Sequence, residues 1–149
     1  MMLRGVLHVG FTVANMDRSV EFYTRLFGIE PFVHRVYEDN YISQLVGYAG
    51  ARLDTALYNI PHSDTVLELI QYLEPKGMPV NTETKNPGTA HLCLATTDLH
   101  ADFNRMVELG ATPRSEGPVK ITSGINQGLR VCYFRDHDGI TIELLEART

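Results

Sequence analysis

The sequence has little of what marks several large classes of protein. Its 149 residues include only two cysteines and no tryptophan, and they contain neither a run of lysine and arginine nor a long apolar stretch. Two cysteines among apolar residues do not suggest a disulfide framework, and a chain without a basic run is a poor partner for nucleic acid or anionic membranes. The short apolar stretches exclude a transmembrane helix, and the first five residues show no signal-peptide pattern. We therefore expect a soluble, cytoplasmic protein with no nucleic-acid or membrane partner.

The most informative feature that the sequence does have is an internal repeat. In each half, a histidine in an apolar strand is followed by an amphipathic helix that ends at a glycine, and a glutamate in another apolar strand closes the half. The histidines are His8 and His91, and the glutamates are Glu68 and Glu143. Two copies are too few for a solenoid, which needs at least three. The repeat therefore predicts a pseudo-twofold pair of modules.

Local patterns predict the same order of elements in both modules. A strand comes first, then a helix, then three more strands, so each module reads βαβββ and the fold class is α+β. Strands are expected at 4–13, 32–38, 51–60 and 65–72, and then at 90–96, 111–116, 129–135 and 140–146. Asn15 or Asp17 can cap the first helix and Gly28 ends it, while Asp98 and Gly110 do the same for the second. Residues 40–48 predict an additional helical turn or lid in the first half only.

These elements divide one expected domain, residues 1–149, into three parts. Module one spans about 3–74 and module two about 90–147. Prolines mixed with glycines and asparagines mark residues 75–89 as the linker between them. The composition, with 44% hydrophobic and 21% charged residues, is that of a folded domain and argues against disorder.

Strand parity places four ionisable side chains opposite the apolar faces of their strands. Side chains alternate across a strand, so each shares its face only with small or apolar neighbours. An unpaired carboxylate in such a setting costs several kcal/mol. A shared divalent cation, one of Zn, Ni, Co, Fe or Mn, explains two imidazoles and two carboxylates at equivalent places. The four candidate metal ligands are His8, Glu68, His91 and Glu143.

The other histidines and the cysteine near His91 do not form such a set. His34 is expected to be a surface or structural residue, although it could line a cavity. His62, His100 and His137 are most simply solvated. Cys93 shares the face of His91, and we interpret it as a small buried hydrophobe.

Several segments resemble one known family. His8, the helix start Asp17–Tyr23 (DRSVEFY) and Leu26–Gly28 are similar to the opening of vicinal oxygen chelate proteins, and Phe134–Leu144 (FRDHDGITIEL) is similar to their last hairpin. That superfamily includes glyoxalase I, methylmalonyl-CoA epimerase, extradiol dioxygenases and the fosfomycin and bleomycin resistance proteins. The resemblance implies an eight-stranded, open, barrel-like sheet with the helices outside, a homodimer, and metal ligands on the first and last strand of each module.

The pattern of ligands implies an activity. A His/Glu/His/Glu set resembles glyoxalase I and methylmalonyl-CoA epimerase, which implies a metal-dependent lyase or isomerase acting through an enediolate on a small oxygenated substrate. The expected general base is Glu143, or Glu68 if it leaves the metal. One alternative is a single-domain Fe(II) extradiol-type dioxygenase, in which Glu68 is not a ligand. The other is a ligand-sequestering, resistance-type binding protein without a tightly bound metal.

Overall fold

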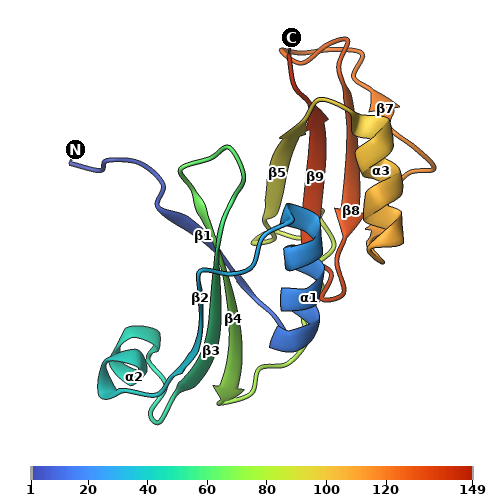
Figure 1. Cartoon of the computed structure of the whole chain (residues 1–149). Coiled ribbons are helices and arrows are strands. Elements are labelled where there is room, and N and C mark those ends of the chain that lie inside the picture. The colour runs from blue at the N-terminus through green and yellow to red at the C-terminus, as the bar shows by residue number, and fades with distance from the viewer. Residues whose placement is uncertain (1, 149) are drawn as a thin grey trace. The chain divides into compact units, whose positions relative to one another are not determined.

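The computed structural model describes residues 2–148, which fall into two compact units divided between Pro79 and Val80 (Figure 1). Each unit contains one βαβββ module, so the predicted α+β class is confirmed. The first unit comprises β1 (His8–Thr12), α1 (Met16–Phe27), β2 (Val33–Tyr37), α2 (Asn40–Val46), β3 (Arg52–Asn59) and β4 (Val66–Glu74). The second comprises β5 (His91–Thr96), α3 (Leu99–Glu108), β6 (Thr112–Pro113), β7 (Val119–Lys120), β8 (Arg130–Arg135) and β9 (Thr141–Glu146).

In the first unit, α1 covers one face of an open four-stranded sheet. The strand order is β1-β4-β3-β2, with β1 parallel to β4 and the other pairs antiparallel. The helix begins where the side chain of Asn15 accepts a hydrogen bond from the backbone N–H of Arg18 at 2.9 Å, as the capping pattern predicts. It ends at Gly28, whose φ of 71° suits glycine best.

The packed face of this sheet is the apolar one. Leu67 and Leu69 of β4 and Tyr58 of β3 are fully buried, and α1 packs on these two strands. Glu68, which alternates with the two leucines, is only partly buried and faces the other way. The sheet therefore has a closed face under α1 and an open face that carries the glutamate.

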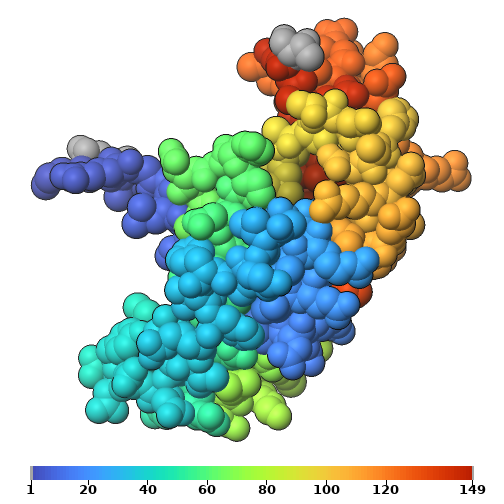
Figure 2. Space-filling view, viewed as in Figure 1, coloured from blue at the N-terminus to red at the C-terminus, as the bar shows by residue number. Residues whose placement is uncertain are grey.

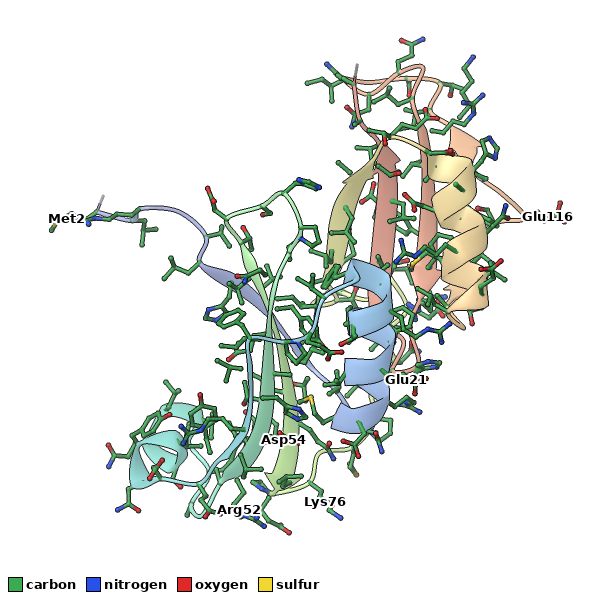
Figure 3. All side chains as sticks on the ribbon, in the orientation of Figure 1. Met2, Glu21, Arg52, Asp54, Lys76 and Glu116 are labelled. Atoms are coloured by element: carbon green, nitrogen blue, oxygen red, sulfur yellow. The ribbon has the colours of Figure 1, made fainter. Side chains whose placement is uncertain are left out.

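Helix α2 covers one end of that open face. Its Ile42 is buried with Ala51 and Leu53, and Ile70 and Tyr72 of β4 pack against this cluster. Because Ile70 and Tyr72 follow Glu68 at intervals of two residues, they share its face. The predicted lid is thus a two-turn helix, and the segment around it forms a projecting lobe in Figure 2. In Figure 3, Arg52 and Lys76 mark the same end of the unit.

The second unit repeats this arrangement. Its strand order is β5-β9-β8-β6, with β5 parallel to β9 and the short β7 also paired with β8. Helix α3 starts at Asp98, whose carboxylate accepts a hydrogen bond from the N–H of Ala101 at 3.0 Å. It packs on β8 and β9, where the ring of Phe103 lies 5.1 Å from that of Phe134.

Two predicted strands are shorter in the structure than expected. The strand expected at 4–13 forms only as β1 (His8–Thr12), because its partner β4 begins at Val66, opposite His8. Residues 111–116 contain only the two-residue β6, and β7 adds a second short strand after Gly117 and Pro118. Pro113 and Pro118 have no N–H to donate to a neighbouring strand, which explains the interruption. The described residues therefore form nine strands in two open sheets rather than the eight expected. None of the helices in residues 2–148 is long and apolar enough to cross a membrane.

The predicted linker belongs partly to each unit. The boundary after Pro79 falls inside residues 75–89. Beyond it, the guanidinium of Arg135 donates hydrogen bonds to the backbone oxygen of Thr82 at 2.7 Å and to its hydroxyl at 3.2 Å. The same guanidinium lies 3.5 Å from the carboxylate of Glu83. These contacts fix the second part of the linker to the open face of the second sheet.

Candidate metal centre

The first unit places two of the four predicted ligands side by side. Nε2 of His8 lies 3.4 Å from Oε2 of Glu68. His8 belongs to β1 and Glu68 to the neighbouring parallel strand β4, and both lie on the open face of the sheet. The His8 side chain is 55% exposed and that of Glu68 is 24% exposed, so the pair is accessible from solvent.

The second unit forms an equivalent pair. Nε2 of His91 lies 3.0 Å from Oε2 of Glu143, on the neighbouring parallel strands β5 and β9. Their side chains are 44% and 15% exposed. Strand β5 alternates as predicted, with His91 and Cys93 exposed and Leu92 buried. Cys93 is therefore not the buried hydrophobe that its apolar neighbours suggest, because its strand position directs it to the open face.

Strand register makes the two pairs equivalent in detail. In the first unit, the residue paired with Glu68 is Gly10, two positions after His8. In the second unit, the residue paired with Glu143 is Cys93, two positions after His91. Each histidine therefore reaches its glutamate diagonally across a parallel strand pair, and the repeat seen in the sequence becomes a repeat of side-chain geometry.

The surroundings of the two glutamates differ. Glu143 has Cys93 beside it on β5 and Tyr133 beside it on β8. Although Cys93 as a residue is exposed, its thiol is partly desolvated. This desolvation, the negative charge of Glu143 and hydrogen bonding to its carboxylate raise the pKa of the thiol to about 11. The same causes, with burial the largest, raise the pKa of the Tyr133 phenol. Glu68 has Gly10 and Leu57 in the corresponding places, and neither carries a polar side chain.

The geometry of each pair fits two neighbouring ligands of one metal ion. Donors bound about 2.1 Å from an ion lie about 3.0 Å apart at an octahedral angle and about 3.4 Å apart at a tetrahedral one. The observed Nε2–Oε2 separations are 3.4 Å and 3.0 Å. Imidazole nitrogen and carboxylate oxygen together suit Zn, Ni, Co, Mn and Fe. Residues 2–148 show no group of three or more His, Cys, Asp or Glu side chains placed to hold a metal, so each pair alone supplies two donors.

The remaining histidines lie outside these pairs. Nε2 of His34, on β2, lies 3.3 Å from Oδ1 of Asp54 on the neighbouring strand β3, so His34 pairs with a residue of the same sheet. His62 and His137 lie in turns, and His100 is exposed on α3, as expected. The polar loop 122–128 lines a cavity of about 620 Å³ with Ile125 and Gln127. That cavity adjoins Thr96, at the opposite end of β5 from His91.

Tyr133 is the site residue that sequence reasoning missed. Its ring centroid lies 5.4 Å from that of His91, and its partner across the strands is Glu143. A signal was present in the sequence: Tyr133 and Glu143 are equally distant from Asp138, in the turn of the last hairpin. Residues placed in this way pair in an antiparallel hairpin and share a face.

The chain is similar to several known proteins. Lactoylglutathione lyase GLX1 of Arabidopsis thaliana is 28% identical over 145 residues, which are 96% of this chain but only 44% of that protein. The chain thus spans less than half the length of this plant relative. A 2-epi-5-epi-valiolone epimerase from Actinomyces sp. is 29% identical over 146 residues, covering 94% of this chain and 78% of that protein.

A solved structure and a family model extend the likeness to the whole chain. A glyoxalase family protein from Bacillus cereus has the same fold, with a TM-score of 0.82 at 20% identity, over 98% of this chain and 95% of that one. The model of the Glyoxalase/Bleomycin resistance protein/Dioxygenase superfamily matches residues 5–144. The chain therefore belongs to the glyoxalase/bleomycin resistance protein/dioxygenase superfamily.

Proposed function

We propose that the two His–Glu pairs bind one divalent metal ion, and that the protein is a glyoxalase-type lyase or isomerase that moves a proton beside a carbonyl group. The observation that carries this proposal is the equivalence of the pairs: His8–Glu68 and His91–Glu143 have the same register and ligand-like separations. Relatives that are a lactoylglutathione lyase and an epimerase support this class of reaction. Four donors complete a typical metal site, whereas two do not.

The proposed chemistry divides between the ion and the chain. A bound divalent ion polarises a carbonyl oxygen as a Lewis acid. His8 and His91 would hold such an ion with their imidazole nitrogens, beside the two carboxylates. One carboxylate, Glu68 or Glu143, removes the proton from the carbon beside the carbonyl and returns it. The substrate is a small molecule with neighbouring oxygens, and we propose a homodimer, in which the four ligands come from one chain or from two.

The test begins with the metal content of the anaerobically purified protein, measured by mass spectrometry. We expect about one Ni, Co, Mn or Zn ion for every two His–Glu pairs, that is, one ion for each set of four ligands. His8→Ala and His91→Ala should each lower the metal affinity at least tenfold, because each removes one of four ligands. His100→Ala is the matched control, since His100 is exposed on α3. A wild-type protein without bound metal contradicts the proposal and favours the binding-protein alternative.

The reaction class is tested by following the carbon-bound proton. The protein is incubated in deuterated water with hemithioacetals of 2-oxo aldehydes and with 2-oxo thioesters, and deuterium at the carbon beside the carbonyl is followed by proton NMR. Enzyme-dependent exchange or isomerisation supports the proposal. Iron that remains bound in Glu68→Ala, together with oxygen uptake on catechol-type substrates, contradicts it and favours the dioxygenase.

A further inference from the structure

The two His–Glu pairs share one geometry but not one environment. Across the strands, Glu143 is flanked by the thiol of Cys93 and the phenol of Tyr133. Glu68, in the equivalent place, is flanked by Gly10 and Leu57. A carboxylate beside two groups that carry a polar hydrogen is held in one orientation, whereas one beside a glycine and a leucine is not.

Tyr133 contacts both members of its pair. Its ring centroid lies 5.4 Å from that of His91, at an interplanar angle of 37°, and its strand position faces Glu143. The Glu68 carboxylate is paired with His8, and its cross-strand neighbours Gly10 and Leu57 offer it no polar hydrogen from a side chain. The pairs also differ in tightness, with Nε2–Oε2 separations of 3.0 Å for His91–Glu143 and 3.4 Å for His8–Glu68.

From this asymmetry we propose that Tyr133 is a positioning residue that holds Glu143 as the fixed metal ligand and leaves Glu68 as the carboxylate that transfers the proton. The inference rests on the proposed function. Groups that hydrogen-bond a metal ligand from outside fix its orientation, and their loss typically lowers metal affinity 10- to 100-fold. A general base must instead take up and release a proton in each catalytic cycle, so its contacts change each time. The carboxylate with fewer contacts suits this role better.

The proton transfer assigned to Glu68 balances without a further reactant. The C–H bond beside the carbonyl breaks, its electron pair moves toward the carbonyl group, and the proton goes to the Glu68 carboxylate. In a substrate whose neighbouring carbon carries a hydroxyl, Glu68 then delivers this proton to the former carbonyl carbon. The hydroxyl-bearing carbon becomes the new carbonyl, and the hydroxyl proton passes to the former carbonyl oxygen. Substrate and product are isomers, so neither an oxidant nor a reductant is needed.

The first experiment tests Tyr133 through metal affinity, which does not depend on activity. The dissociation constant for Ni²⁺ is measured by competition with a chromophoric chelator for the wild-type protein, Tyr133→Phe and Tyr72→Phe. We expect Tyr133→Phe to raise it 10- to 100-fold. Tyr72→Phe is the matched control, because Tyr72 also lies on an open sheet face and contacts an aromatic ring, that of Tyr48 at 6.1 Å. Its dissociation constant should equal that of the wild-type protein.

The second experiment exchanges the roles of the two glutamates. Glu143→Gln should lose Ni²⁺ affinity at least tenfold more than Glu68→Gln, whereas Glu68→Gln, once loaded with metal, should lose at least a hundredfold in proton exchange. Leu57→Tyr places a phenol opposite Glu68, in the position that Tyr133 occupies opposite Glu143. This variant should bind Ni²⁺ more tightly and exchange the substrate proton more slowly.

The outcomes separate this inference from the proposed function. A wild-type protein that binds no divalent ion overturns the proposed function. A wild-type protein that binds Ni²⁺, with Tyr133→Phe binding it equally well, overturns the inference alone. So does the reverse order of the glutamates, in which Glu68→Gln loses the metal and Glu143→Gln retains it.

Discussion

Gly10 leaves open the space into which the carboxylate of Glu68 extends. A Cβ atom on Gly10 would lie 3.3 Å from Oε2 of Glu68, closer than most such contacts in proteins. The strand itself tolerates a side chain there, since Gly10 has no positive φ. The constraint on this position therefore comes from the carboxylate and not from the backbone.

Gly10→Ala is expected to separate stability from activity. Replacing a strand glycine by alanine reduces the entropy of the unfolded chain, so the free energy of unfolding should stay equal or rise by about 0.5 kcal/mol. The new methyl group displaces Glu68, and proton exchange on the substrate should slow at least fivefold. Both are measured on one preparation, by urea denaturation and by NMR. Gly77→Ala is the control, because nothing lies within 4 Å of a Cβ atom there; equal exchange rates in the two variants would contradict the prediction.

Tyr58 should make the stability of the first unit depend on alkaline pH. Burial is the main cause that raises its pKa above 10, and its fully buried hydroxyl donates a hydrogen bond to the backbone oxygen of Val20 at 3.2 Å. A raised pKa of an acid means that the fold favours the neutral phenol. Its contribution to stability is complete below pH 10 and is lost as the pH rises through the pKa of the folded state.

Tyr58→Phe tests this sign. At pH 8, the variant should lose about 1 kcal/mol of unfolding free energy with the hydrogen bond. At pH 11, the difference from the wild-type protein should shrink or reverse, because only the wild-type protein has a phenol to ionise there. Urea denaturation at both values provides the measurement. A difference that stays constant between pH 8 and pH 11 would show that Tyr58 does not titrate with unfolding.

Removing Ile42 should detach α2 from the open face of the first sheet. Ile42 is 5% exposed and packs on Ala51 and Leu53. Truncation of a buried isoleucine typically costs about 2–5 kcal/mol. Because α2 is short, we expect Ile42→Ala to accelerate hydrogen exchange in α2 far more than in α1. Leu45→Ala, at a position 75% exposed, should change neither quantity, and uniform acceleration across the unit would contradict local detachment.

Arg135→Met should release the linker segment that adjoins the second sheet. The guanidinium is 12% exposed and donates to the backbone oxygen of Thr82 at 2.7 Å. Without it, cleavage after Lys85 by a lysine-specific protease should become at least several-fold faster. Arg52→Met removes an Arg–Glu pair with both side chains well exposed, which contributes little, and should leave cleavage unchanged. Equal cleavage of the Arg135 variant and the wild-type protein would mean that other contacts hold the segment.

The sequence predicted those parts of the site that depend on local periodicity. Alternation of side chains in β1 and β4 is enough to put His8 and Glu68 on the face opposite the apolar one. The repeat extends this placement to His91 and Glu143. Residue types and spacing carry this information within a single strand, and the structure confirms that each histidine meets its glutamate.

The sequence did not predict what depends on packing between elements. The contact of Tyr133 with His91 requires the register of β8 against β9, which no single strand encodes. The helix at α2 was expected, but its position on the open face follows from the packing of Ile42 against Leu53 of β3, a contact between two elements. The strand expected at 111–116 was too long because Pro113 and the following Pro118 count against pairing only once a partner strand is in place.

Both units carry their histidine on a strand at the margin of a sheet. Among residues 2–148, no strand pairs with the outer side of β1 or β5, so each leaves a row of backbone N–H and C=O groups unsatisfied by the sheet. Such rows are templates for intermolecular pairing and aggregation, and short strands limit the hazard. β1 and β5 have five and six residues. Lengthening either strand to reshape the proposed metal site would therefore also enlarge a surface for aggregation.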